Sequence, residues 1–261
     1  MKYPFTPEAL DALPEELAEL FRELEITLLE EICSRLKPSG QLNEVTVQDI
    51  RALRSHGVSL DEIEKAIADT TGVGREKLNK LLQDVVERNQ AYYTGLMDIA
   101  HVTAPPALVN AADIAAIISQ AQREYGNITR SMGFLVDNGR TMLPPARAYQ
   151  WALDSAALQI ESGAISYNQA IASAVKQLAD SGIRTVEYES GRRDHIDVAA
   201  RRAVMSGVNA LCQKYSEQSM EYLDTTLVEV SAHIGARNID GPNGWEAHTK
   251  WQGRCFRWNK K

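Results

Sequence analysis

The chain has 261 residues, of which 44% are hydrophobic and 24% charged, and its net charge at pH 7 is −7. These values are normal for a soluble globular protein with an ample core. No run approaches the roughly 18 apolar residues of a membrane span, and the N-terminus lacks the apolar region of a signal peptide. We therefore expect a protein that stays inside a cell or inside something assembled there. The cysteines Cys33, Cys212 and Cys255 are widely separated and form no CxxC pair, which argues against disulfides.

The charge is unevenly distributed along the chain. Residues 1–100 carry 11 Lys and Arg against 19 Asp and Glu, a net charge of −8. Residues 190–261 carry 11 against 8, a net charge of +3. This division indicates two surfaces with different partners, but +3 is too weak to predict nucleic-acid binding alone.

The first element is a helix predicted from about Pro14 to Leu36. Its apolar positions recur at helical spacing, and they are Leu17, Leu20, Phe21, Leu24, Leu28 and Ile32. Glutamates fill much of the remaining surface, and Pro38-Ser39-Gly40 ends the helix. Two interpretations stay open: an arm that docks on a partner helix, or a surface helix that packs on its own domain.

Residues 46–72 are predicted to form two short helices. Thr46 and Ser59 are typical N-caps, and a tight turn lies between the helices at residues 55–58. The spacing is similar to that of a helix-turn-helix, which makes a DNA-binding regulator one hypothesis. However, Ser59–Asp69 carries four acidic residues against one lysine, a balance that would repel phosphates. DNA binding by this segment is therefore the weakest of our hypotheses.

A long helix is predicted from about Arg75 to Ala100, and Pro105-Pro106 is the clearest break in the chain. We place the domain boundary there, between a helical N-terminal region (1–104) and a C-terminal domain (105–261). Further helices are predicted over 108–125, from Pro145 to Glu161 and from Ser166 to Gly182. Between the first two of these lies a stretch punctuated by glycine and asparagine.

Two short strands are predicted in the C-terminal domain, over Thr185–Glu189 and Leu227–Ser231. A helix from about Ile196 to Leu223 separates them, and the two strands are expected to pair across it. The predicted fold is therefore mainly α, with a helical N-terminal region followed by an α+β C-terminal domain that contains a small sheet.

Four arginines crowd the start of that helix, and they are Arg192, Arg193, Arg201 and Arg202. The N-terminus of a helix carries the positive end of its dipole, so cations there need an anionic partner. That partner is either DNA or another external anion, or it is a set of nearby carboxylates such as Asp194, Asp197 and Glu189.

No nucleotide-binding, hydrolase or metalloprotease motif is present. The most enzyme-like group is His233, His248 and Cys255, but their spacing fits no standard zinc finger. No base, orienting residue and oxyanion hole can be identified together. We therefore predict no catalytic residue, metal or cofactor, and keep a small metal-dependent or transferase-like enzyme as the alternative. The terminal tryptophans (Trp245, Trp251, Trp258) indicate an apolar patch for docking or for packing on the domain.

The C-terminal half carries a set of motifs in a fixed order. They are Tyr188-Glu-Ser-Gly-Arg192, Arg201-Arg-Ala-Val204, Ser206-Gly-Val208, Val228-Glu-Val-Ser-Ala-His-Ile-Gly-Ala-Arg237 and His248-Thr-Lys-Trp-Gln-Gly253. In these motifs the chain resembles the tailed-phage minor capsid protein 2 family, which looks related to Mu F-type head morphogenesis proteins. The resemblance is collinear over about residues 143–254, and the helical N-terminal part is compatible with it. The family-signature positions are Ser231, His233, Arg237, His248, Trp251, Gln252 and Gly253.

The resemblance implies a virion structural protein that is present in few copies and is not an enzyme. It implies a place near the portal vertex, with a role in head assembly, DNA packaging or DNA exit. Expected partners are the portal protein, the major capsid protein, or both, together with packaged DNA, and no membrane. The expected location is the phage head, assembled in the host cytoplasm. The sequence does not fix the oligomeric state.

The end of the chain departs from the family pattern. Family members usually continue past Trp251-Gln-Gly253 into a segment rich in Gly, Cys and His, whereas this sequence stops at Lys261. Either a naturally short version or a fragment is expected. If that further segment completes a site with His233 and His248, the site is incomplete in this sequence.

Overall fold

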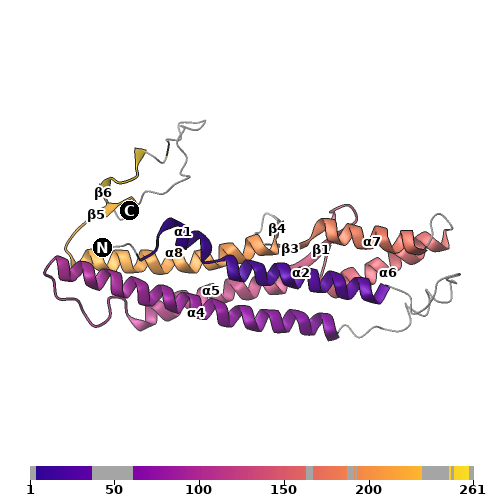
Figure 1. The fold of residues 1–261 in the computed structure, drawn as a ribbon, viewed down its shortest axis with the longest axis horizontal. Helices are drawn as coiled ribbons and strands as arrows, with labels where there is room; N and C mark the ends of the chain where they lie inside the picture. Colours follow the sequence, from indigo (N-terminus) through magenta and orange to yellow (C-terminus); the bar gives the residue numbers. More distant parts are fainter. Residues whose placement is uncertain are drawn as a thin grey trace. The chain divides into compact units, whose positions relative to one another are not determined.

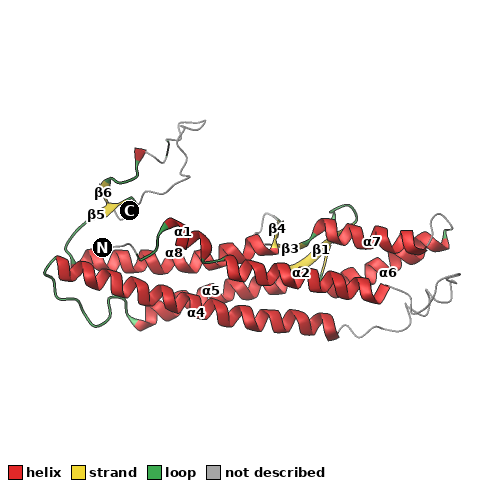
Figure 2. Cartoon of the chain, viewed as in Figure 1, coloured by secondary structure: helices red, strands yellow, loops and turns green. Residues whose placement is uncertain are grey.

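The computed structural model describes residues 4–36, 61–162, 167–186, 191, 193–230, 247 and 250–258. The described chain is mainly helical with short antiparallel strands, which confirms the predicted fold class (Figure 2). Its helices are α1 (Pro7–Ala12), α2 (Glu15–Leu36), α4 (Asp61–Ile99), α5 (Ala111–Ser131), α6 (Pro145–Glu161), α7 (Tyr167–Ser181) and α8 (Ile196–Tyr222). Its strands are β1 (Met132–Val136), β2 (Thr141–Leu143), β3 (Ile183–Val186), β4 (Arg193–His195), β5 (Leu227–Glu229) and β6 (Cys255–Arg257). None of these helices is long and apolar enough to cross a membrane.

The chain forms two compact units, and each draws on several segments. The first unit comprises Met1–Ala12, Leu82–Ile117 and Val208–Lys261, and the second comprises Leu13–Leu81 and Ile118–Gly207. Helices α4, α5 and α8 therefore contribute residues to both units (Figure 1). The domain boundary predicted between residues 104 and 105 stays a prediction.

Helix α2 buries its apolar stripe in the second unit, where it packs against α6 and α7. Leu17, Phe21, Leu28 and Ile32 are at most 1% exposed, and Leu24 is also buried. Removal of these side chains from water is the main free-energy term that holds the helix in place. Of the two interpretations left open by the sequence, the structure supports a helix packed on its own unit.

Helix α4 is continuous, whereas the sequence predicted a helix from Ser59 and a separate helix from about Arg75. Gly72 and Gly74 lie inside α4. A larger residue at position 74 would clash with a neighbour, because a Cβ atom there would lie 2.9 Å from Cζ of the buried Tyr125. The predicted break was therefore wrong, since a glycine that makes room for a side chain looks in sequence like a helix terminator. The predicted cap at Thr46 and the turn at residues 55–58 lie outside the described residues.

The larger sheet belongs to the second unit and has the strand order β2-β1-β3-β4, all antiparallel. Sequence reasoning missed the β1–β2 hairpin and described this part of the chain only as a stretch punctuated by glycine and asparagine. Asp137 and Asn138 both have positive φ, 51° and 55°, and the Gly139 N–H donates to the Val136 carbonyl at 3.1 Å. These values describe a turn whose twist matches antiparallel strands.

The strand predicted at Thr185–Glu189 is observed as β3, two residues earlier at its start. The strand predicted at Leu227–Ser231 is observed as β5, but it does not pair with β3. It pairs with β6, with Val228 opposite Phe256. The predicted strand–helix–strand pairing was wrong, because each strand finds an antiparallel neighbour elsewhere: β3 pairs with β1 and β4, and β5 pairs with β6.

The first unit has its own core, which is built from Met97, Leu108, Val109 and Tyr215. The rings of Tyr93 and Tyr215 stack with their centroids 6.5 Å apart. Two helices in this unit end in the same way. His101 (φ 56°) follows α4 and Asp224 (φ 47°) follows α8. In each case the next residue donates its N–H to a carbonyl five residues back, Val102 to Met97 and Thr225 to Met220, which is the Schellman arrangement.

Candidate functional site

The signature residues that the structure describes form a turn that leads into β6. The Gly253 N–H donates to the Val230 carbonyl at 2.8 Å, and the Val230 N–H donates to the Arg254 carbonyl at 3.0 Å. Gly253 has φ +66°, a conformation that favours glycine. The Trp251 ring lies 5.2 Å from the Phe256 ring. Trp251 and Gly253, the ends of the Trp-Gln-Gly motif, thus help to close the β5–β6 ribbon.

The remaining signature residues Ser231, His233, Arg237 and His248 lie outside the described residues, as does Trp245. Cys255 is exposed on β6, opposite Glu229. Among the described residues, no group of three or more His, Cys, Asp or Glu side chains is arranged to hold a metal ion. The structure therefore does not test whether His233, His248 and Cys255 come together.

The arginines near the start of α8 contact groups of the chain itself. Arg202 forms an ion pair with Asp194 at 2.6 Å, and Arg201 forms one with Glu15 of α2. The Arg193 guanidinium donates to the Gly139 carbonyl at 3.1 Å. Arg192 lies outside the described residues. Of the carboxylates considered from the sequence, Asp194 does hold an arginine, whereas Glu15 was not considered because it lies 186 residues from Arg201.

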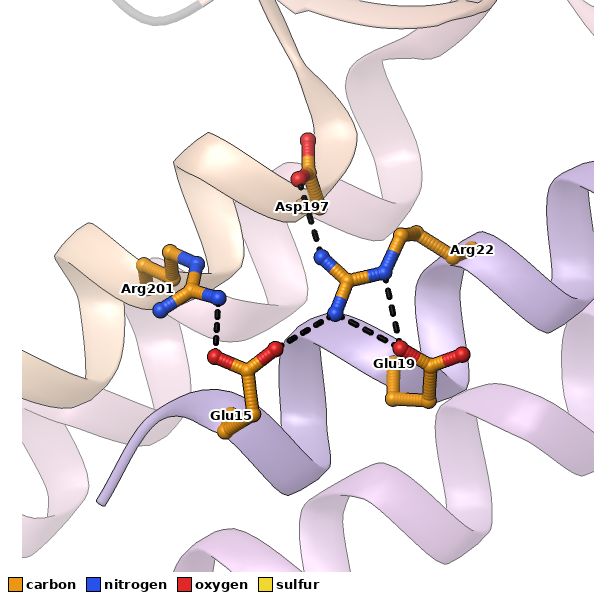
Figure 3. A network of polar contacts seen from close by, with 5 residues as sticks. All are labelled: Glu15, Glu19, Arg22, Asp197 and Arg201. Carbon is orange, nitrogen blue, oxygen red and sulfur yellow. Dashed lines mark hydrogen bonds and ion pairs between the residues drawn. The ribbon is translucent and has the colours of Figure 1, made fainter. Parts of the chain in front are cut away.

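Arg201 is part of a five-residue network within the second unit that joins the start of α2 to the start of α8 (Figure 3). The Arg22 guanidinium pairs with Glu15 and Glu19 at 2.6 Å, and with Asp197 at 3.4 Å. The Arg201 guanidinium, followed by that of Arg22, lowers the pKa of the Glu15 carboxyl below its usual 4.5. All of these side chains are at least a quarter exposed, so each pair contributes little stability alone.

A further contact places the sheet relative to α2. The Glu25 carboxylate accepts the N–H of Ile183, the first residue of β3, at 3.0 Å. Sequence reasoning did not single out Glu25. Its role was not visible because the partner is a backbone group 158 residues away.

The opposite side of α2 faces solvent. Glu19, Glu23, Ile26, Thr27 and Glu30 are exposed and follow one another at helical spacing, and Ile26 is 57% exposed. We call these five residues the outer stripe of α2. It combines carboxylates with an exposed apolar side chain, which are the features of a surface that can bind a basic partner.

Comparison with known protein families settles the class of protein. The model of the family described as phage minor capsid protein 2 matches residues 5–260, nearly the whole chain. The chain belongs to the phage minor capsid protein 2 family. The resemblance seen in the C-terminal motifs is thereby confirmed, and it extends over the N-terminal helices as well. No curated protein and no solved structure matches the chain.

Membership gives this minor capsid protein a structural role in the phage head and places it in the virion. The family is defined as a capsid component and not by a reaction, which favours a protein without enzymatic activity. In the described part of the chain, the charged side chains near the start of α8 pair with one another and tie helices together.

Proposed function

We propose that this minor capsid protein is a non-enzymatic structural component near the portal vertex, which acts in head assembly, DNA packaging or DNA exit. It joins the head by binding the portal protein, or the major capsid protein beside it, through the outer stripe of α2. Assembly takes place in the host cytoplasm. The observation that carries the proposal is the division of α2 into two faces: its apolar stripe is buried in its own unit, and its acidic stripe is exposed.

Because of this division, α2 cannot bind a partner through its apolar stripe. A helix that docks through its apolar stripe must leave that stripe free, but Phe21, Leu28 and Ile32 are fully buried. The partner therefore meets the outer stripe, where Glu23 and Glu30 lie seven residues apart on either side of Ile26. A partner surface with Lys or Arg around an apolar depression would match this arrangement.

The test is co-elution of the full chain with the portal protein encoded in the same phage genome. Deletion of α2 is unsuitable, because it would expose the core of the second unit. The variant Glu23→Lys/Glu30→Lys reverses the charge of the stripe and leaves the buried side intact. We expect it to lose co-elution while its circular dichroism spectrum stays unchanged.

The matched control is Glu64→Lys/Asp69→Lys, which makes the same change of charge at exposed positions of α4. We expect this control to bind like the parent chain. Equal binding by all three chains would remove the outer stripe from the mechanism. Absence of any association with the portal protein and with the major capsid protein would overturn the proposal.

A further inference from the structure

A groove lies in the first unit where α8 ends and the β5–β6 ribbon begins. Its volume is about 360 Å³. Glu217, Met220 and Glu221 line it from the last turns of α8, Asp224 and Thr226 line it from the connection, and Trp258 lines it from the ribbon. Figure 1 shows β5 and β6 paired beyond the end of α8.

The groove offers apolar surface that a solvated connection would not need. That surface comes from Trp258, which is 44% exposed, and from Met220, which lines the groove from the last turn of α8. The Trp258 N–H donates to the Thr226 carbonyl at 2.6 Å, so the backbone that carries the indole ring is fixed. Large aromatic side chains that are held rigid at a surface are typical of binding sites.

The electrostatics of the groove select the partner. Three carboxylates line it, from Glu217, Glu221 and Asp224, and the C-terminus of α8 adds the negative end of a helix dipole. Gln213 and Gln218 donate to Glu217 and Glu221, and these amides are neutral. Lys214, one turn earlier, is paired with Asp113 at 2.7 Å and also interacts electrostatically with Glu217 and Glu221. One lysine that is shared with Asp113 does not neutralise the three carboxylates that line the groove. The groove is therefore negative as well as apolar.

We propose that this groove binds a polypeptide segment of another virion protein in which an arginine or lysine stands next to an apolar residue. The cationic side chain lies between the carboxylates and the indole ring of Trp258, which attracts a cation through its ring face. The apolar neighbour covers Met220. A small ribbon of two strands is only marginally stable by itself, so an occupant that bridges α8 and Trp258 also fixes the ribbon.

That the partner is a virion protein rests on the proposed function, but the surface is distinct from the outer stripe of α2. The test uses the full chain and immobilised twelve-residue peptides that tile each head protein of the same phage genome. We expect the bound peptides to carry Arg or Lys beside an apolar residue. Glu217→Gln/Glu221→Gln should weaken their binding roughly five- to tenfold, and Trp258→Ala should weaken it to a similar extent. Added salt should weaken the parent chain more than the double variant.

The matched control is Glu64→Gln/Asp69→Gln, which removes the same two charges at exposed positions of α4 and should bind the peptides like the parent chain. If the proposed function fails, portal co-elution is absent while peptide binding persists. If the groove proposal fails, no peptide binds, or the bound peptides are indifferent to Glu217, Glu221 and Trp258. A dimer of the chain that dissociates in Glu217→Gln/Glu221→Gln would assign the groove to a second copy and would also overturn the proposal.

Discussion

Gly72 and Gly74 stand two positions apart in α4 and meet different surroundings. A Cβ at Gly72 would have nothing within 4 Å, whereas one at Gly74 would press on Tyr125. Tyr125 cannot move aside easily, because its ring is fully buried and lies 5.7 Å from that of Phe21. Burial also raises the pKa of Tyr125 to about 12, so its hydroxyl stays protonated and donates to the Thr71 carbonyl at 3.2 Å.

Alanine at these two positions should therefore change stability in opposite directions. Gly72→Ala removes the flexibility of glycine in a helix and should raise the free energy of unfolding by about 0.5–1 kcal/mol. Gly74→Ala gains the same term, but overpacking the contact with Tyr125 costs about 1–3 kcal/mol, so its free energy of unfolding should fall by up to about 2.5 kcal/mol. Urea denaturation of the three chains measures both effects. Equal changes in the free energy of unfolding for the two variants would show that the Tyr125 side chain moves aside without an energetic penalty.

His101 occupies a backbone conformation that costs energy for any residue with a Cβ. It closes the Schellman arrangement after α4 with φ 56°, and its side chain is exposed. His101→Gly should raise the free energy of unfolding by up to about 1 kcal/mol, because glycine adopts this conformation without strain. His101→Ala keeps the Cβ and is the matched control, for which thermal unfolding should show no gain. If His101→Ala raised the free energy of unfolding as much as His101→Gly does, backbone strain at this position would be excluded as the cause.

At the scale of elements, helix boundaries can be predicted from apolar periodicity and from capping residues. The boundaries of α2, α6, α7 and α8 were placed to within one or two residues by apolar spacing and by the residues that begin or end each helix. Strands were harder to predict. β1 is buried at four of its five positions, so it shows no alternation of apolar and polar residues. Short, buried strands are stabilised by their neighbours in the sheet, and one sequence does not reveal those neighbours.

The ion-pair network around Glu15 makes the stability of the contact between α2 and α8 depend on pH. Its arginine partners lower the pKa of Glu15, so the stabilising interaction is present at neutral pH and is lost as pH falls below 4.5 toward the lowered value. Glu15→Gln should therefore reduce stability at pH 7, and the difference from the parent chain should vanish at strongly acidic pH. Urea titrations across this range measure it. Arg201→Gln supplies the control, since its effect should overlap with that of Glu15→Gln in a double-mutant cycle. A difference that persists in acid would exclude the ion pairs as its cause.

At the scale of the whole molecule, the class of protein was more predictable than its site. Ordered motifs in the C-terminal half were enough to place the chain in its family, because a chain of motifs in fixed order carries much information. The contacts of the arginines were not predictable. Arg201 pairs with Glu15 across 186 residues, and only the packing of α2 brings the two together. Patterns within one segment cannot report a contact that the fold creates between segments.

The same contact bears on whether these arginines can bind DNA. Binding of duplex DNA by Arg201 and Arg202 would require both to leave the carboxylates of Glu15 and Asp194, so each would exchange one ionic partner for another. We therefore expect Arg201→Gln and Arg202→Gln to lower the free energy of unfolding without lowering affinity for duplex DNA. Fluorescence anisotropy at several salt concentrations measures the affinity, since each lost phosphate contact reduces the salt dependence. A weaker, less salt-dependent complex with unchanged stability would instead assign these arginines to DNA.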